Sequence, residues 1–179
     1  MVAANNLVLV SGPSRGGKSR WAESLLKDCP RVTYVATSAP RPNDPSWQAR
    51  LELHKSRRPR SWKLLETTDQ LPEDLSKLSS DQALLIDALG GFVASCIELD
   101  PILWDQRCQA LIQSITAHAE QVVVVIEETG WGVVPATAIG GLFRDRIGAL
   151  AQQLEQHSKR SWLVVQGRAL DLHALGIPV

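Results

Sequence analysis

The hydrophobic pattern divides the chain into short apolar runs that alternate with longer amphipathic stretches. Compact apolar runs, several of them rich in β-branched residues, predict buried strands, and apolar positions three to four residues apart predict helices. The predicted strands span residues 7–10, 32–36, 61–65, 83–86, 122–126 and 162–165. The predicted helices span residues 19–27, 47–55, 102–118 and 139–156, and the proline-containing segment 41–45 is predicted as a loop.

This alternation of strands and helices is typical of an α/β fold with a mostly parallel central sheet flanked by helices. No internal repeat, low-complexity tract or linker interrupts it, so residues 1–179 are predicted to form a single domain. The polar stretch 66–80 and the tail 168–179 carry no clear pattern, and no element is predicted there.

The composition is that of an ordinary globular protein, with 44% hydrophobic and 21% charged residues. Lys plus Arg and Asp plus Glu both total 19, so no excess positive field favours nucleic acid as a partner. No apolar run approaches the roughly 20 residues that span a bilayer, and the first residues do not resemble a signal peptide. We therefore expect a cytoplasmic protein without a membrane span. The spacing of its three cysteines suggests neither a metal site nor a redox site.

The strongest motif lies between the first predicted strand and the first predicted helix. Residues 12–19 match the pattern G-x-x-x-x-G-K-[ST], whose backbone N–H groups surround phosphate oxygens. Lys18 is predicted to reach the β- and γ-phosphates as a catalytic residue, and the Ser19 hydroxyl is predicted to bind Mg²⁺. The candidate nucleotide-binding residues of this loop are Gly12, Pro13, Ser14, Arg15, Gly16, Gly17, Lys18 and Ser19.

A phosphate loop of this kind needs an acidic partner, which normally lies at the end of a neighbouring strand. Asp87 follows the predicted strand 83–86, and Glu127 and Glu128 follow the strand 122–126. Because the carboxyl ends of parallel strands meet at the ligand-binding edge of a sheet, all three are candidates. Asp87 is the preferred nucleotide contact and metal ligand, whereas helix capping or solvent exposure is the alternative for each carboxylate.

His54 lies in the most basic segment of the chain, residues 50–60. Neighbouring positive charges disfavour the imidazolium form and favour a neutral, nucleophilic ring. Attack of such a ring on phosphorus would give a covalent phosphoramidate, although a solvated histidine without a role is the alternative. The other histidines, His118, His157 and His173, are predicted to lie at the surface.

Several further segments occur in an order that resembles one enzyme family over nearly the whole chain. After the phosphate loop come Tyr34-Val-Ala-Thr-Ser38, Arg50-Leu-x-x-His54-x-x-x-Arg58-Pro59-x-x-Trp62, Glu128-x-Gly130-x-Gly132-Val-Val-Pro135 and Phe143-Arg-Asp145-x-x-Gly148. The set resembles the bifunctional adenosylcobinamide kinase/adenosylcobinamide-phosphate guanylyltransferase family. The chain departs from the family pattern in the segment from Asp87 to Ser95 and at Glu127, where asparagine is usual.

The resemblance implies a RecA-like P-loop NTPase fold and two reactions of cobalamin biosynthesis. Adenosylcobinamide is phosphorylated by ATP or GTP, and GMP then passes from GTP through a guanylylated histidine to adenosylcobinamide phosphate, giving adenosylcobinamide-GDP. The histidine falls on His54. Beyond the phosphate loop, the implied nucleotide-binding residues are Ala36, Thr37, Ser38, Lys55, Ser56, Arg57, Arg58, Glu66 and Asp87. Family members look like trimers, so a homo-oligomer is expected.

Two alternatives stay open on the sequence. One is a P-loop kinase of a small metabolite that makes no use of His54. The other is a nucleotide-binding module without catalysis, although the chain has no recognisable guanine-specific Asn-Lys-x-Asp segment. A covalent GMP adduct on the protein would distinguish the predicted transferase from both.

Overall fold

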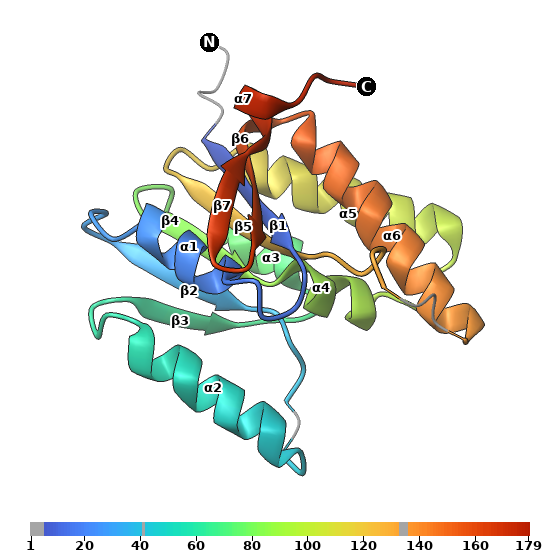
Figure 1. Cartoon of the computed structure of the whole chain (residues 1–179), viewed down its shortest axis with the longest axis horizontal. Coiled ribbons are helices and arrows are strands. Elements are labelled where there is room, and N and C mark those ends of the chain that lie inside the picture. The colour runs from blue at the N-terminus through green and yellow to red at the C-terminus, as the bar shows by residue number, and fades with distance from the viewer. Residues whose placement is uncertain (1–5, 41, 133–135) are drawn as a thin grey trace.

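The fold is built around a central sheet, shown in a computed structural model (Figure 1). The structure describes residues 6–40, 42–132 and 136–179. Within these residues the sheet has seven strands in the order β3-β2-β4-β5-β1-β6-β7, and all neighbouring pairs are parallel except β6 and β7. The strands are β1 (Leu7–Gly12), β2 (Val32–Ala36), β3 (Lys63–Glu66), β4 (Ala83–Asp87), β5 (Val122–Glu127), β6 (Ser158–Val165) and β7 (Arg168–Asp171). The predicted α/β class with a mostly parallel sheet is confirmed.

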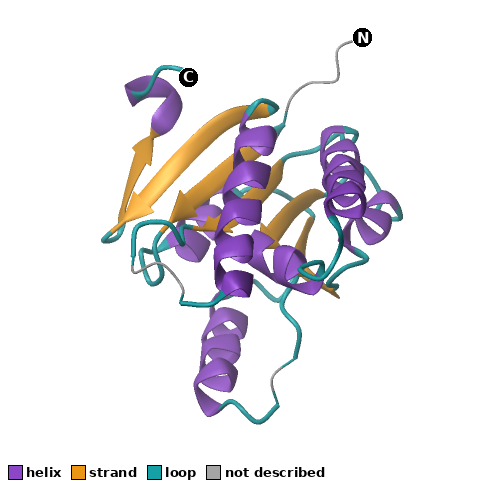
Figure 2. Cartoon of the chain, turned by 90° about the vertical axis from the view of Figure 1, so that its right-hand side faces the viewer, coloured by secondary structure: helices purple, strands orange, loops and turns teal. Residues whose placement is uncertain are grey.

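Helices cover both faces of this sheet (Figures 1 and 2). Successive residues of a strand face opposite sides, so Leu7 and Leu9 belong to one buried cluster while Val8 and Val10 belong to the other. The first cluster also contains side chains of α3, α4, α5 and α6, and the second contains side chains of α1. The helices are α1 (Lys18–Leu25), α2 (Pro45–Arg57), α3 (Leu71–Ser76), α4 (Leu89–Ser95), α5 (Pro101–Thr116), α6 (Ala138–Glu155) and α7 (Leu172–Leu175).

The helix α2 stands apart from these layers, beside the β3 edge of the sheet, and projects from the body of the molecule (Figures 1 and 2). Its last turn carries three basic side chains, those of His54, Lys55 and Arg57. Cations at the C-terminal end of a helix interact favourably with its dipole.

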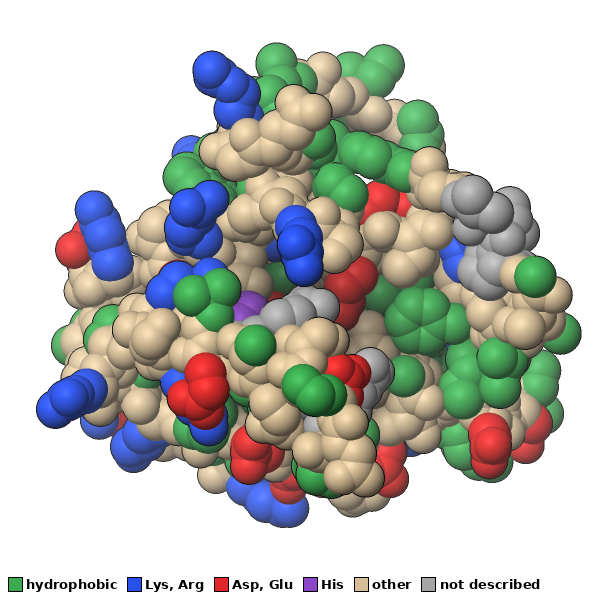
Figure 3. Space-filling model, turned by 60° about the horizontal axis from the view of Figure 1, so that its bottom comes forward, with side chains coloured by type: hydrophobic (Ala, Val, Ile, Leu, Met, Phe, Trp, Pro, Cys, Tyr) green, Lys and Arg blue, Asp and Glu red, His purple; other side chains and the backbone are tan. Residues whose placement is uncertain are grey.

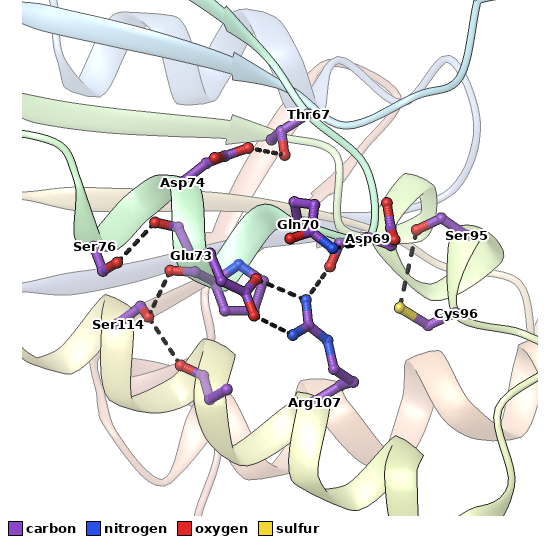
Figure 4. Close-up of polar contacts among 12 residues, drawn as sticks. Thr67, Asp69, Gln70, Glu73, Asp74, Ser76, Ser95, Cys96, Arg107 and Ser114 are labelled. Atoms are coloured by element: carbon purple, nitrogen blue, oxygen red, sulfur yellow. Dashed lines mark hydrogen bonds and ion pairs between the residues drawn. The ribbon is translucent and has the colours of Figure 1, made fainter.

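Polar contacts anchor the short helices that precede and follow β4. Arg107 of α5 reaches the Glu73 carboxylate of α3 with both terminal nitrogens, one at 2.9 Å, and also donates to the backbone oxygen of Asp69 (Figure 4). The hydrogen bond from Arg107 lowers the pKa of Glu73. Ser114 of the same helix donates to the backbone oxygen of Pro72 at 2.9 Å. The helix α3 is therefore fixed to α5 by side chains as well as by apolar packing.

The buried Arg146 of α6 provides a similar anchor for the end of α4. Its guanidinium packs 4.8 Å from the centre of the Trp104 ring. It donates to the backbone oxygens of Cys96 (2.9 Å), Ile97 (3.0 Å) and Leu99 (2.5 Å). These carbonyls follow α4, where helix geometry leaves acceptors without intrahelical donors.

Several sequence predictions need correction. The segment 66–80 contains α3, and α4 follows β4 directly. The last predicted strand begins at Ser158 rather than at residue 162, and the tail adds β7 and α7. His118 is not at the surface: only 7% exposed, its Nε2 lies 2.7 Å from the backbone oxygen of Gln82.

Other expectations concern the cysteines and the membrane. Cys29, Cys96 and Cys108 are free thiols, and burial raises the pKa of Cys108 to about 12. Among the described residues, no helix is both long and apolar enough to traverse a bilayer. Arg41 of the predicted loop and Val133 to Pro135 of a family motif lie outside the described residues.

Candidate active site

The phosphate loop lies at the carboxyl end of β1, where the chain turns through Gly12 and enters α1 at Lys18. Gly12 and Gly17 have φ of 144° and 105°, in the range that favours glycine. A Cβ on Gly12 or on Gly16 would overlap the backbone oxygen of Val164 on β6. The loop is therefore packed directly on the last part of β6, and a hydrogen bond of 2.9 Å from the Gly167 nitrogen to the Gly16 oxygen closes this contact.

Lys18 folds back over this loop. Its side chain is only 9% exposed, and Nζ donates to the backbone oxygen of Pro13 at 2.8 Å. Ser19 is the second residue of α1. Backbone N–H groups of the loop and the N-terminal end of α1 together supply the positive environment that phosphate groups bind. The whole motif, residues 12–19, therefore lies on the single connection from β1 into α1.

Two carboxylates end the strands on one side of the loop. Glu127 is paired with Gly12 across β5 and β1, and Asp87 ends β4, the next strand along. The Glu127 carboxylate accepts a hydrogen bond of 2.9 Å from the Gly90 nitrogen. Burial raises the pKa of Glu127, and the negative charge of Asp87 adds to this effect while Lys18 opposes it. Glu128 instead accepts from the Gly130 nitrogen at 2.5 Å and stabilises the following turn.

His54 meets Asp87 at this edge of the sheet. The His54 Nδ1 lies 3.7 Å from Asp87 Oδ2, and the two side chains are 22% and 8% exposed. Tyr34, on β2, lies between them: its hydroxyl donates to Asp87 Oδ2 at 2.9 Å and lies 3.4 Å from His54 Nδ1. Burial and the nearby Asp87 carboxylate raise the pKa of Tyr34 far above its usual value, so its hydroxyl stays protonated.

Basic side chains at and just beyond the end of α2 lie beside this contact. Arg57 Nη2 lies 3.4 Å from His54 Nδ1 and 3.3 Å from the Glu23 carboxylate of α1. The Arg58 guanidinium packs over the Tyr34 ring, 4.2 Å from its centre, in a cation–π contact. Burial raises the pKa of Glu23, and the charge of Arg57 opposes that shift. The basic neighbours expected from the sequence are only part of the surroundings of His54, because its ring contacts a carboxylate and a phenol as well.

The remaining candidates fall into two groups. Arg58 and Lys55 line a hollow of about 210 Å³ together with Pro59, Arg60, Trp62 and Leu64. By contrast, the Ser56 hydroxyl donates back to its own helix, to the Leu53 oxygen at 2.9 Å.

Ala36, Thr37 and Ser38 lie at and just beyond the end of β2. The Thr37 side chain is fully buried and donates to the backbone oxygen of Ala88. Glu66 ends β3, in register with Ala36, and is exposed. Because β3 is the edge strand, Glu66 lies on the far side of β2 from Asp87.

Figure 3 shows the molecular surface on this side. A histidine is visible in a hollow, with Lys and Arg side chains on one side of it and Asp and Glu side chains on the other. Hydrophobic side chains gather at the far end of this face. Neither Tyr34 nor Glu23 was assigned chemistry from the sequence. Tyr34 lies in a segment of the family resemblance, but nothing in one sequence distinguishes a buried tyrosine or a helix glutamate with a role from one without.

A glycine-rich loop between a strand and a helix, with carboxylates at the ends of the next two strands on one side of it, defines a P-loop NTPase fold. The chain belongs to the cobinamide kinase / cobinamide phosphate guanyltransferase family, whose profile matches residues 8–172. It is therefore a transferase.

Relatives from three bacteria agree with this assignment. The bifunctional adenosylcobalamin biosynthesis proteins CobU of Escherichia coli and of Salmonella typhimurium are each 34% identical over 176 residues, covering 90% of this chain and 96% of the relative. The bifunctional adenosylcobalamin biosynthesis protein CobP of Pseudomonas aeruginosa is 30% identical over 167 residues, covering 92% and 95%.

Solved structures support the fold alone. An ATPase from the type III secretion system of pathogenic bacteria superimposes with a TM-score of 0.57 at 9% identity, covering 97% of this chain and 59% of the other. A Pyrococcus horikoshii protein studied as PH0250 superimposes with a TM-score of 0.53 at 9% identity, covering 94% and 86%.

Proposed function

We propose that this chain performs both reactions expected of its family. It phosphorylates adenosylcobinamide with ATP or GTP, and it then transfers GMP from GTP through a guanylylated His54 to adenosylcobinamide phosphate, giving adenosylcobinamide-GDP. The observation that carries the second reaction is the position of His54, 3.7 Å from the strand-end carboxylate of Asp87 on the sheet edge that also carries the phosphate loop. A kinase without a covalent intermediate does not need a nucleophile there.

In the kinase reaction, the phosphate loop and Lys18 hold the β- and γ-phosphates. The acceptor hydroxyl attacks the γ-phosphorus, a new O–P bond forms, and the bond to the bridging oxygen breaks. Glu127 is the proposed general base that accepts the hydroxyl proton. Its raised pKa supports this role, because a base with a pKa closer to neutrality accepts a proton more readily.

The residues present fit Mg²⁺, which prefers oxygen ligands. Ser19 supplies a hydroxyl and Asp87 a carboxylate, and both lie at the phosphate-binding edge. Tyr34 and His54 both contact the same oxygen of Asp87, Oδ2, so a cation can use Oδ1. When bound, Mg²⁺ would neutralise charge on the β- and γ-phosphates.

The groups around His54 indicate which ring nitrogen carries the proton. Tyr34 uses its single proton to bond Asp87, so its oxygen accepts from His54 Nδ1. Arg57 is only a donor and would need the opposite tautomer, but it also pairs with Glu23 and lies on the more exposed side. We assign the proton to Nδ1, which makes Nε2 the attacking nitrogen.

Guanylyl transfer then proceeds in two steps. Nε2 attacks the α-phosphorus of GTP, the Nε2–P bond forms, and pyrophosphate leaves as the bond to the bridging oxygen breaks. The ring carries a positive charge in this intermediate, which the Tyr34–Asp87 pair stabilises through Nδ1. A phosphate oxygen of the acceptor next attacks the same phosphorus, the N–P bond breaks, and His54 returns to its neutral form.

The test is labelling with α-³²P-GTP and Mg²⁺, comparing the wild type with His54→Ala. His157→Ala is the matched control, because His157 is an exposed histidine just beyond the end of α6. Acid-labile, alkali-stable label on the wild type and the control alone is the expected result. A folded, GTP-binding wild type that takes no label would leave a P-loop kinase as the better description.

The trimer and the cytoplasmic location also belong to this proposal. Exposed apolar side chains on α5 and α6, those of Ile102, Leu103, Ile139 and Leu142, support contact between copies of the chain. Light scattering of the purified protein measures the oligomer, and a monomer at working concentrations would contradict the trimer.

A further inference from the structure

The ion pair between Glu23 and Arg57 links the two helices that carry the chemistry of the site. Glu23 lies on α1, the helix that begins at Lys18 of the phosphate loop, and Arg57 ends α2, three residues after His54. Arg57 Nη2 lies 3.3 Å from Glu23 Oε1, and the Arg57 and Glu23 side chains are 30% and 12% exposed. Because the pair is largely shielded from water, its attraction is stronger than that of an exposed surface pair.

The same nitrogen of Arg57 lies beside the nucleophilic ring. Arg57 Nη2 is 3.4 Å from His54 Nδ1, so it stands between a charged acceptor, Glu23, and a neutral one. Both separations are longer than the roughly 2.7–3.2 Å of a well-formed hydrogen bond, so the guanidinium moves toward the acceptor that attracts it more. Hydrogen bonds to a carboxylate are stronger than those to a neutral group, so Glu23 retains the guanidinium.

The position of this guanidinium affects which nitrogen of His54 carries the proton. An arginine N–H can only donate, and Nδ1 can accept from it only in the tautomer whose proton is on Nε2. The Tyr34 hydroxyl, 3.4 Å from the same Nδ1, gives its proton to Asp87 and accepts from Nδ1 in the other tautomer. Arg57 and Tyr34 therefore favour opposite tautomers, and the balance between them depends on how strongly Glu23 holds Arg57.

We propose that Glu23 is a positioning residue for guanylyl transfer, which acts through Arg57 to keep the His54 proton on Nδ1. By holding the guanidinium, Glu23 leaves Nδ1 to donate to Tyr34 and leaves the lone pair of Nε2 for attack on phosphorus. Without the carboxylate, Arg57 donates to Nδ1, the proton lies on Nε2, and that nitrogen cannot form the N–P bond. The inference rests on the proposed guanylyltransferase function, and it gives Glu23 no role in the kinase reaction.

Nitrogen NMR of the histidine rings tests the tautomer directly. Protein labelled with ¹⁵N-histidine is measured at a pH where the rings are neutral, and the His54 signals are those missing from His54→Ala. We expect Nδ1–H in the wild type and Nε2–H as the main form in Glu23→Gln, which keeps the shape of the side chain and removes its charge. Glu52→Gln is the matched control, because Glu52 forms an exposed ion pair with Lys55 on the helix that carries His54, and its tautomer should match the wild type.

The rates of the two reactions give a second test. In Glu23→Gln, labelling by α-³²P-GTP should slow by at least about tenfold, the factor that corresponds to the loss of one hydrogen bond to a charged group. Phosphoryl transfer from γ-³²P-ATP to adenosylcobinamide should change far less. In an Arg57→Met background, Glu23→Gln should change the labelling rate by less than about twofold, because the competing donor is absent.

A wild type with its proton on Nε2, or a folded Glu23→Gln protein that keeps Nδ1–H, would overturn the proposal. Equal slowing of both reactions would overturn it as well, because Glu23 would then support the fold rather than the tautomer. The same holds if Glu23→Gln slows labelling as much without Arg57 as with it. If the tautomer changes as expected but the wild type acquires no GMP label, Glu23 sets the tautomer and only the guanylyltransferase proposal fails.

Discussion

Replacing Tyr34 with phenylalanine isolates the contact on which the histidine chemistry depends. Phenylalanine keeps the ring that Arg58 covers at 4.2 Å, so packing and the cation–π contact are preserved. The substitution removes only the hydroxyl, which donates to Asp87 at 2.9 Å and lies 3.4 Å from His54 Nδ1. Any change in rate or stability therefore reports on that hydroxyl.

The size of the effect follows from the loss of a hydrogen bond to a charged group. Such bonds contribute about 1.5–3 kcal/mol, and Asp87 is only 8% exposed, so water replaces the lost donor poorly. If the bond strengthens as His54 becomes positively charged, the same energy corresponds to a roughly 10- to 150-fold slower labelling step. The melting temperature should fall as well, by about 2–4 °C for each kcal/mol in a domain of this size.

Single-turnover labelling with α-³²P-GTP measures the rate, and calorimetry measures the melting temperature. Phosphoryl transfer from γ-³²P-ATP to adenosylcobinamide serves as the control, and we expect it to change less than threefold. Labelling within twofold of the wild type in a protein with a lowered melting temperature would refute the reasoning, because the hydroxyl would then be structural only.

Three further variants test other parts of the site and its support. Glu127→Gln should abolish most kinase activity. Because burial raises the pKa of Glu127, the wild type loses stability as the pH rises from the ordinary glutamate pKa through the raised one. Chemical denaturation should therefore show that the variant gains stability relative to the wild type across that pH range. A variant with the same pH dependence as the wild type would contradict this. Gly12→Ala should lower stability by about 1–3 kcal/mol and weaken GTP binding at least tenfold by calorimetry, because its Cβ overlaps the Val164 oxygen; unchanged binding would show that the loop adapts. Arg146→Met should cost about 3 kcal/mol or more in urea unfolding, since buried and partly buried carbonyls lose their donor, whereas the partly exposed Arg144→Met should cost under about 1 kcal/mol. Equal costs would refute the anchoring role.

The apolar runs predicted the central part of the fold because burial on both faces leaves a continuous hydrophobic signal. The strands β1, β2, β4 and β5 were all found in this way. The start of β6 was missed because residues 158–161 are mostly polar, as expected of a part of the strand that pairs with β1 but not with β7. The helices α3 and α4 have six and seven residues, too few to establish a helical period.

The candidate site was predicted in pieces. The phosphate loop is a contiguous motif, so the sequence places its residues together. His54 and Asp87 were each identified. Their contact depends on β2 and β4 being neighbours and on the last turn of α2 lying beside the ends of these strands, which no local pattern encodes. Tyr34 was missed as a partner for the same reason.

The order of the strands has a consequence for how the protein is made. The phosphate loop is synthesised before the strands that support it, because β1 pairs with β5 and β6, which lie more than a hundred residues later in the chain. The loop also rests on the Val164 carbonyl and on Gly167. While a ribosome is still adding residues up to 167, the motif therefore exists as sequence without its supporting strand. Nucleotide binding is acquired late in synthesis, and a nascent chain arrested before β6 should emerge without a competent phosphate site.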